Sequence, residues 1–406
     1  MFVGMNMRQL SVGECFYQIR NGANIKQGDI SGGYPITRIE TTANDTFNRD
    51  RMGYAGITDL TKYESYILDD GDLLMSHINS VQYLGRTVLY RKQNDETIIH
   101  GMNLLVLKAR REIMLPEYAR YCFYSHSFRE QLSRITKKSV NQASFTVADL
   151  KKITILVPSL AEQLSIVAVL DKCVGILDMR KAELSTLDDL IKTRFVEMFG
   201  EPFDTSRWEM KELKDLSESM VDGSNVDPTY YEPEGKVLFL RIQNVWRNEF
   251  RLADSVYITP EINRTLYYDT SLKKGDLLIT KIGRYYTKDS SLGRVSVYLG
   301  ENDCANYSNN IMRVRLKDSV DSEFVNALLN LDEYQSFIKR TSKGGTDKRA
   351  LSKSLIGSYP IIVPPTRLQK EFIGFIKQVD KSKDAIKKSL AETQTLFDSL
   401  MQTYFG

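Results

Sequence analysis

Two loops of this sequence gather side chains that suit contact with nucleic acid. Each loop follows a Gly-Asp-Leu-Leu segment, at residues 71–74 and 275–278. The candidates are Ser76, His77 and Asn79 in the first loop, and Lys281, Arg284, Tyr285, Tyr286 and Lys288 in the second. Arginine and lysine can contact guanine edges or phosphates, asparagine and histidine can bond to base edges, and tyrosine can stack. A solvated hairpin loop whose tyrosines cover a sheet would show the same composition, so both interpretations stay open.

A second pair of basic clusters lies further along the chain, ahead of two similar short strands. Its members are Lys137 and Lys138 in the first half, and Lys343, Lys348 and Arg349 in the second. Their positive charge would suit contact with phosphate groups. A run of charge is also the ordinary composition of a solvated surface, so the pattern alone does not decide between the two.

The motifs of common catalytic and motor proteins are missing from the sequence. There is no Asn/Asp-Pro-Pro-aromatic loop of an amino-methyltransferase, no GxxxxGK[ST] phosphate loop, and neither GxSxG nor HExxH. Asp204, Glu209 and Lys211 form a loose string of the kind found in metal-dependent nucleases, but we expect only the first strand of a domain there. Four cysteines without a CxxC pair and three histidines without ligand spacing predict no metal site.

The composition is that of a folded protein of two or three domains. The chain has 406 residues, 42% of them hydrophobic and 26% charged, and domains of ordinary size could each bury a core. The net charge of +3 slightly favours a polyanionic partner without identifying one. No apolar stretch approaches the ~18 residues of a membrane span, the first residues lack a signal-peptide pattern, and the cysteine usage favours a reducing compartment. We therefore expect a cytoplasmic protein that does not cross a membrane.

The chain contains an internal repeat. Residues 157–200 match residues 363–406 without a gap, at a shift of 206 positions. Nine of the 44 positions are identical, among them Gln163 and Gln369. Self-similarity over such a length is the signature of a duplicated structural unit.

The regions upstream of the two copies are related more loosely. Gly85 and Arg86 correspond to Gly293 and Arg294, while the loops between such anchors differ in length. Short β-branched and aromatic runs, each set followed by a helical pattern at 116–136 or 322–342, predict mixed α/β domains. We predict a first variable domain at 1–152, a strand and long helix at 153–203, a second variable domain at 204–358, and a second strand and long helix at 359–406.

Each repeated segment predicts a short strand, a proline-led turn and one helix of about 38 residues. Apolar side chains recur every seven residues along the first helix, and the second has the row Val379, Ile386, Thr393 and Leu400 flanked by Leu390 and Phe397. Such a period is the pattern of a coiled-coil seam. The predicted seam consists of Leu170, Leu177, Leu184, Ile191 and Met198 in the first helix, and Val379, Ile386, Leu390, Phe397 and Leu400 in the second. A repeat related by an approximate two-fold axis would pair the helices antiparallel. The expected fold is α+β, with two mixed domains separated by an antiparallel coiled coil.

Two related but non-identical domains on a rigid spacer suit a partner that is itself a regular rod. Duplex DNA is such a partner, because domains about one helical turn, ~34 Å, apart could contact two half-sites on one side of it. The sequence therefore favours binding to double-stranded DNA.

The whole layout resembles the DNA-specificity (S) subunit of Type I restriction-modification systems. The resemblance rests on the duplicated strand-Pro-x-x-x-x-Gln-helix segment, on the Gly-Asp-Leu-Leu loop and Gly-Arg pair before each copy, and on the Phe-Gly that closes it. It covers essentially the whole chain. The family often has Glu-Gln at the helix start, which the first copy keeps as Glu162-Gln163 while the second has Leu368-Gln369.

This resemblance implies a non-catalytic subunit with two target-recognition domains, which read a bipartite sequence whose spacer is set by the helices. It implies two methyltransferase (M) subunits, which methylate adenine N6 with S-adenosylmethionine, and restriction (R) subunits, which translocate and cut DNA with ATP and Mg²⁺. No cofactor is expected on this chain. The M contacts would fall on outward polar faces of the helices, for example at Asp178, Arg180, Lys181, Asp384 and Lys387.

Other classes of function stay open on the residues alone. A protein-interaction scaffold would bind no DNA even with its methyltransferase present. A nuclease or methyltransferase fragment would show activity as an isolated chain. An orphan or antirestriction role would leave the same sequence pattern.

Overall fold

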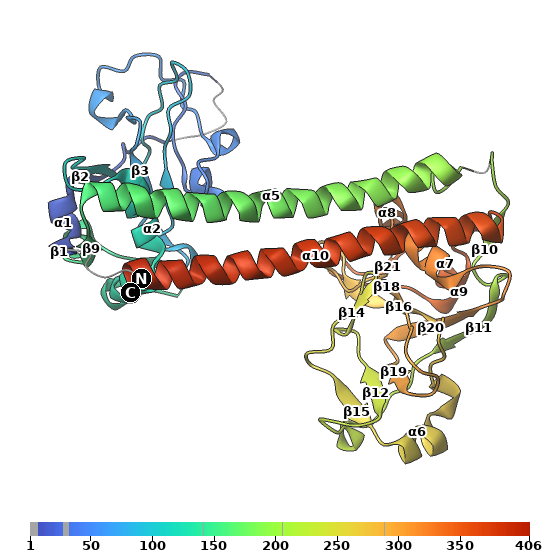
Figure 1. The fold of residues 1–406 in the computed structure, drawn as a ribbon. Coiled ribbons are helices and arrows are strands. Elements are labelled where there is room, and N and C mark those ends of the chain that lie inside the picture. Colours follow the sequence, from blue (N-terminus) through green and yellow to red (C-terminus); the bar gives the residue numbers. More distant parts are fainter. Residues whose placement is uncertain (1–6, 27–31, 141, 205, 288) are drawn as a thin grey trace. The chain divides into compact units, whose positions relative to one another are not determined.

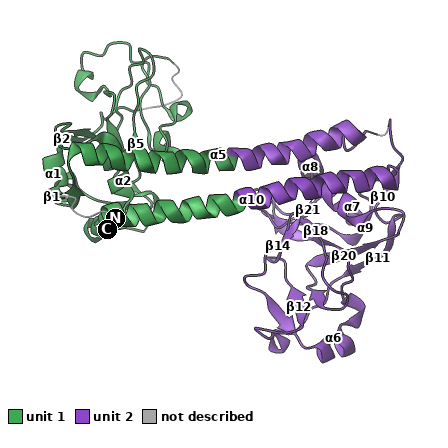
Figure 2. Cartoon of the chain, in the orientation of Figure 1, with its two compact units in different colours: residues 1–181, 387–406 green, residues 182–386 purple. Residues whose placement is uncertain are grey.

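The computed structural model describes residues 7–26, 32–140, 142–204, 206–287 and 289–406. It divides into two compact units (Figure 2). Unit 1 comprises residues 1–181 and 387–406, and unit 2 comprises residues 182–386. Each unit therefore combines one of the two predicted variable domains with parts of both long helices.

Each unit is built on a four-stranded antiparallel sheet, with the order β2-β6-β3-β5 in unit 1 and β11-β20-β16-β18 in unit 2. Figure 1 labels β2 and β3 of the first sheet and β11, β16, β18 and β20 of the second. The strands of unit 1 are β2 (Phe16–Asn21), β6 (Leu104–Ala109), β3 (Leu73–Ser76) and β5 (Thr87–Leu89). Those of unit 2 are β11 (Ser217–Asp222), β20 (Ile311–Leu316), β16 (Leu277–Thr280) and β18 (Val295–Val297). The two Gly-Asp-Leu-Leu segments thus lead into matching inner strands, β3 and β16, in which every residue is buried.

Two short helices follow the sheet in each unit. They are α2 (Pro116–Tyr124) and α3 (His126–Ile135) in unit 1, and α7 (Ser322–Leu329) and α8 (Asp332–Thr341) in unit 2. The sequence predicts one helical segment at each place, whereas the structure has two. At Ser125 the angle ψ is 154°, and its Oγ accepts a hydrogen bond from Phe128 N at 3.3 Å. Ser125 therefore caps α3 instead of extending α2.

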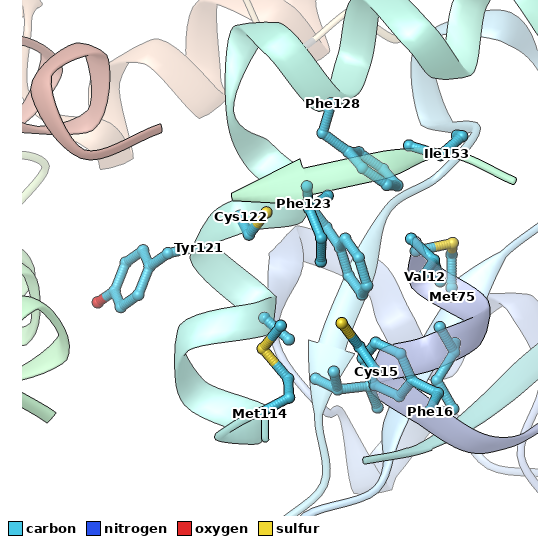
Figure 3. Packing of buried hydrophobic residues seen from close by; sticks show 14 of the residues in the cluster. Val12, Cys15, Phe16, Met75, Met114, Tyr121, Cys122, Phe123, Phe128 and Ile153 are labelled. Atoms are coloured by element: carbon cyan, nitrogen blue, oxygen red, sulfur yellow. The ribbon is translucent and has the colours of Figure 1, made fainter. Parts of the chain in front are cut away.

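Aromatic and sulfur-containing side chains fill the core of unit 1 (Figure 3). The rings of Phe16 and Phe123 have centroids 5.8 Å apart, and those of Phe123 and Phe128 are 4.6 Å apart. Cys15 and Cys122 are buried in the same core as free thiols. Burial raises the pKa of Cys15 to about 11 and also raises the pKa of Cys122. Both cysteines are therefore protonated packing residues.

A two-stranded antiparallel sheet closes each domain onto its repeated segment. In unit 1, β1 (Arg8–Ser11) pairs with β9 (Thr154–Val157), and in unit 2, β10 (Met210–Glu212) pairs with β23 (Pro360–Ile362). The neighbouring short helices are α1 (Val12–Cys15), α4 (Val147–Leu150) and α9 (Lys353–Gly357). In the nuclease-like string, Lys211 Nζ pairs with Glu209 Oε2 at 3.3 Å. The described residues contain no group of three or more side chains placed to hold a metal ion.

The segments inserted between the repeated anchors differ between the units. Unit 2 has a sheet of β15 (Val256–Ile258), β12 (Val237–Leu240) and β19 (Ala305–Tyr307), a hairpin of β13 (Val245–Trp246) and β14 (Glu249–Phe250), and helix α6 (Pro260–Leu266). At the corresponding place unit 1 has the 3-10 helices η1 (Ile39–Asp45), η2 (Arg49–Arg51) and η3 (Glu64–Tyr66). The common sheet is therefore a framework, and the inserts give each domain its own surface.

The long helices are α5 (Leu160–Phe199) and α10 (Thr366–Phe405), each of 40 residues. In unit 1 the start of α5 and the end of α10 enter one core, where Phe405 packs on Tyr118 with ring centroids 5.1 Å apart. In unit 2 the end of α5 and the start of α10 meet, and the centroids of Phe199 and Phe372 are 5.5 Å apart. The helices therefore run antiparallel within each unit, and the α+β fold class with its repeated two-domain arrangement is confirmed.

The predicted seam residues differ in burial along the helices. Leu170, Leu177, Val379 and Ile386 are buried, and Leu184, Ile191, Met198, Leu390, Phe397 and Leu400 are half-buried. Lys383 also lies in the heptad rows, four residues after Val379, and its ammonium forms an ion pair with Asp188 in unit 2. A polar residue at such a position favours one register over others.

Gln163 and Gln369, identical in the two repeats, hold the start of each long helix. Both side chains are fully buried. Gln163 Nε2 donates to Ile113 O and Pro158 O at 2.8 and 2.9 Å, and its Oε1 accepts from Leu115 N at 2.8 Å. Gln369 makes the matching bonds, donating to Pro364 O at 2.7 Å and accepting from Asp321 N at 2.8 Å. The spacing between proline and glutamine, which is the same in both copies, thus satisfies buried backbone groups.

The second helix start has Leu368 where the first has Glu162, and the neighbouring residues explain why a glutamate would make no cap there. In the first copy, Ser159 and Glu162 form a reciprocal cap, in which Ser159 N donates to Glu162 Oε2 at 2.9 Å and Glu162 N donates to Ser159 Oγ at 3.4 Å. In the second copy the position of Ser159 is occupied by Pro365, which has neither a hydroxyl nor an N–H. Leu368 instead packs against the apolar core of unit 2.

None of the helices among the described residues combines the length and the apolar character needed to span a membrane.

Candidate nucleic-acid interface

Each unit contains a small three-stranded antiparallel sheet built from both of its predicted contact segments. In unit 1, β8 (Ala143–Ser144) pairs with β4 (Ile78–Asn79) and β7 (Lys137–Lys138). In unit 2, β22 (Lys348–Ala350) pairs with β17 (Ile282–Arg284) and β21 (Lys343–Gly344). The sequence offers the two segments as separate candidates, and the structure joins them. Arg284 and Lys348, for example, are direct partners across the ladder.

The Gly-Arg pairs close the loops that contain these strands. Gly85 and Gly293 have φ angles of 71° and 70°, where glycine is favoured. A Cβ on Gly85 would lie 2.3 Å from Leu132 Cδ2, and one on Gly293 would lie 2.4 Å from Ile338 Cγ2. The glycines therefore allow each loop to return closely over α3 or α8.

Arg294 and Arg86 fix the loop to the neighbouring insert. Arg294 donates to Ser290 O at 2.9 Å and to Val245 O at 3.4 Å, and its guanidinium lies 3.6 Å from the centroid of the Trp246 ring. In unit 1, Arg86 Nε pairs with Asp45 Oδ1 at 3.0 Å. The two arginines therefore help to position the loops, and the donors of the buried Arg294 are bonded within the protein.

In unit 1 the predicted reading residues do not all reach the surface. Ser76 is fully buried and His77 is 5% exposed, so neither side chain can touch a base, contrary to the prediction. The cause is that β3, which ends at Ser76, is an inner strand of the large sheet. Asn79 is half-buried and uses its amide locally, donating to Ser76 Oγ at 3.2 Å and accepting from Ser80 N at 2.8 Å. Lys137 and Lys138 are exposed on β7.

We expect unit 1 to lose stability as the pH falls from about 6.5 toward about 4. Burial lowers the pKa of His77 to about 4, whereas an unfolded histidine titrates near 6.5. Between these values the unfolded chain binds more protons, so stability rises with pH through this window and is fully present above it. His77→Phe should reduce the difference between the urea midpoints at pH 7 and pH 5, measured by circular dichroism.

Burial lowers the pKa of His100 to about 3, so His100 contributes in the same direction and will leave part of the pH dependence in the His77 variant. The matched control is His126→Phe, because His126 is exposed. If His77→Phe and His126→Phe kept the same pH dependence as the unchanged chain, the interpretation of His77 as a buried neutral histidine would be wrong.

In unit 2 the predicted residues lie together, but several are already engaged. Lys281 Nζ pairs with Asp222 Oδ1 at 2.6 Å, and its side chain is 18% exposed. Arg349 lies over the ring of Tyr285, with its Cζ 4.0 Å from the centroid. Arg284 is exposed and contacts Asp347 Oδ2 at 3.6 Å. Tyr286, Lys343 and Lys348 are exposed, and Lys288 lies outside the described residues.

A pocket of about 540 Å³ opens beside β17 and β22 in unit 2. Its polar and aromatic lining includes Gln243, Trp246, Arg284, Arg294, Asn310 and Lys348. Gln243, Trp246 and Asn310 are not among the contact residues predicted from the sequence. The available signals were that Gln243 directly follows Phe239-Leu240-Arg241-Ile242, which matches Ile36-Thr37-Arg38-Ile39 in the first half, and that Asn310 directly precedes a strong strand pattern. Neither signal shows which side chains share a pocket.

This lining suits binding to nucleic acid. The exposed ammonium of Lys348 and the guanidinium of Arg284 can contact phosphates or guanine. The amides of Gln243 and Asn310 each offer a donor and an acceptor for base edges. Trp246 forms a wall of the pocket and is not a stacking platform, because Arg251 and Arg294 lie 3.5 and 3.6 Å from its ring centroid. Two groups so close to one centroid must occupy opposite faces.

The aspartates of the Gly-Asp-Leu-Leu segments have a structural role behind these surfaces. Asp276 is 1% exposed and accepts two hydrogen bonds at 2.7 Å, from Nε and Nη2 of Arg315 on β20. Asp72 accepts from Lys108 Nζ on β6, also at 2.7 Å. Each aspartate therefore ties the strand that leads to the interface to its neighbour in the large sheet.

Comparison with known proteins relates both halves to one family. The family model of the Type I restriction modification DNA specificity domain matches residues 12–188 and 205–394. A putative type I restriction enzyme MjaX specificity subunit of Methanocaldococcus jannaschii is 27% identical, over 93% of this chain and 89% of that protein. The type I restriction enzyme EcoKI specificity subunit of Escherichia coli strain K12 is 25% identical over 161 residues, which are 39% of this chain and 34% of that protein.

Solved structures show the same fold. The crystal structure of a Type I restriction-modification system S subunit from M. genitalium matches with a TM-score of 0.58 and 14% identity, covering all of this chain and 98% of that one. A chain from a structure of type I restriction-modification complex assembly matches with a TM-score of 0.57 and 17% identity, covering 98% and 97% of the two chains.

Proposed function

Since this chain belongs to the family of Type I restriction-modification DNA specificity subunits, we propose that each of its two domains reads one part of a bipartite DNA target. The chain is the specificity subunit of such a system and supplies no catalysis itself. The family resemblance inferred from the repeat is thereby confirmed.

One observation carries the bipartite proposal. The same small sheet occurs in both units, in the same place relative to the large sheet of its unit, but with different side chains. Unit 1 offers Lys137 and Lys138, whereas unit 2 offers Arg284 and Lys348 beside a pocket. Two half-sites of different base sequence require two contact surfaces that are placed alike in their domains but carry different side chains.

The long helices offer the surface for the partner subunits. Asp178, Lys181, Asp384 and Lys387 are exposed on them, and we propose that these faces bind two M subunits. Adenine-N6 methylation with S-adenosylmethionine would then take place on the M subunits, and ATP- and Mg²⁺-dependent translocation and cutting on R subunits. Such an assembly acts on genomic DNA, which places it in the cytoplasm.

The proposal is tested by mapping methylated adenines in a host that expresses this chain with the M subunit of its own system. We expect one asymmetric bipartite motif. Replacing residues 281–287 with a Gly-Ser loop of equal length should change the motif in one half only, with the other half as the internal control. A motif unchanged in both halves would contradict reading by this loop.

A mobility shift at low salt separates this function from a scaffold. The complex of this chain with its M subunit should retain a duplex that carries the mapped motif and lose it as salt rises. A complex that binds no DNA would contradict the proposed function.

A further inference from the structure

The pocket of unit 2 contains two amide side chains that the structure leaves available, and the following inference rests on the proposed function. We propose that Gln243 and Asn310 read adenine bases in the major groove and so determine the half-site of unit 2. They are 67 positions apart in the chain but line one pocket of about 540 Å³, next to Arg284 and Lys348.

The backbone at Gln243 is held rigidly. Trp246 Nε1 donates to Gln243 O at 2.9 Å. Asn244, which is 1% exposed, accepts from Arg241 N and donates to Arg251 O, both at 2.9 Å. These bonds fix the turn before β13 and leave the exposed side chain of Gln243 on the pocket wall. A base-contacting side chain on a fixed backbone loses little conformational freedom when DNA binds.

Asn310 is fixed by a different element. It directly precedes β20, an inner strand of the large sheet, and its backbone O accepts from Lys281 N at 2.8 Å. Asn310 is half-buried and lines the same pocket as Gln243. The two amides therefore come from separate elements, and the loop between β16 and β18 is bonded to both. Arg294 ties the loop to the insert that carries Gln243 by its bonds to Ser290 O and Val245 O, and Lys281 N ties it to Asn310.

The chemistry of the amides selects the base. Adenine presents an acceptor, N7, beside a donor, the N6 amino group, and one amide matches both in a bidentate pair. Guanine presents two acceptors, N7 and O6, so the amide oxygen would face a second acceptor and the bidentate pair is lost. Arg284 and Lys348 at the same pocket are positive, so they can hold the phosphates on either side. Arg294 is a positioning residue in this arrangement, because its donors are already bonded within the protein.

The test uses the purified complex of the full chain with its M subunit. A duplex library, randomised over the unit 2 half-site and fixed in the other half, is methylated and the methylated molecules are sequenced. Gln243→Ala and Asn310→Ala should each relax one A·T position at least 10-fold, and the two positions should differ. Gln243→Glu should favour C at the position that Gln243 reads, because a carboxylate accepts from cytosine N4.

Asn309→Ala is the matched control, since Asn309 is an exposed neighbour that does not line the pocket; it should select the same bases as the unchanged chain. Unchanged selection by all three pocket variants would overturn the inference while leaving the proposed function intact. Loss of methylation of every duplex by the alanine variants would also overturn it, because it would show a role in affinity and not in reading. If the unchanged complex selected no bipartite motif, the proposed function itself would fail.

Discussion

Asp276→Ala should lower the free energy of unfolding of unit 2 by about 3 kcal/mol, the lower end of the cost of removing one partner of a buried ion pair, because the Arg315 side chain is still 22% exposed. Asp276 is 1% exposed, and its carboxylate also accepts from Lys273 N at 2.7 Å. The substitution therefore leaves the Arg315 guanidinium, whose side chain is 22% exposed, without its partner. A loss of this size is a large part of the stability of an ordinary domain.

The positions of the tryptophans allow the unfolding of unit 2 to be followed by fluorescence. The chain has two, Trp208 and Trp246, and both lie in unit 2. Tryptophan fluorescence during urea unfolding therefore reports unit 2 alone. The exposed Asp318→Ala serves as the matched control and should change little.

A double variant separates the ion pair from simple truncation. Asp276→Ala with Arg315→Met removes both charges, and we expect it to be more stable than Asp276→Ala alone, because no partly buried charge is then left unpaired. If Asp276→Ala unfolded at the same urea concentration as Asp318→Ala, the structural role assigned to the Gly-Asp-Leu-Leu aspartate would be refuted.

Inserting four residues into both long helices should change nearly the whole set of methylated sites. The insertion should alter the spacer of the bipartite DNA motif and leave the base sequence of its two half-sites unchanged. The insertions are placed after Lys181 in α5 and after Ile386 in α10, where the chain passes between the units. Four helical residues add about 6 Å and about 40° of rotation. One base-pair step supplies about 3.4 Å and about 35°. We therefore expect a spacer one or two base pairs longer.

The control for the insertion keeps helix length constant. Substituting the exposed residues 182, 183, 185 and 186 in α5 and 388, 391, 392 and 395 in α10 with the residue types of the insertion changes the same region without lengthening it and keeps Leu184 and Leu390. The spacer should then stay as it is. Methylation mapping reads both outcomes. Altered half-sites with a constant spacer in the insertion variant would show that the helices do not set the spacing.

Local periodicity explains which parts of the fold could be predicted. The heptad recurrence of residues such as Leu170 and Leu177 gave the long helices, because helix geometry relates residues only a few positions apart. The break between α2 and α3 at Ser125 was missed, since the cap depends on a single ψ angle that the helical pattern around it conceals. Each unit contains one half of α5 and one half of α10, because Phe199 packs in the core of unit 2 and Phe405 in the core of unit 1. These contacts join segments far apart in the sequence, so no local pattern predicts them.

The candidate nucleic-acid interface was even harder to predict from local sequence patterns than the fold. Ser76 and His77 have the right chemistry for reading bases but follow an inner strand, so the sheet buries them. Gln243 and Asn310 have equally suitable chemistry but belong to separate anchors, so no spacing in the sequence joins them. Residue type was predictable in both cases, and exposure was not.

By itself, the sequence determined the duplication, the paired long helices, the Gly-Asp-Leu-Leu and Gly-Arg anchors and, through them, the family. These features are carried by residue identities and by short periodic spacings, which survive in the linear chain. Only the tertiary structure decided which polar side chains face solvent and which of them share a surface. Burial is set by sheet order and by packing between segments tens of residues apart, and both arise only when the chain has folded.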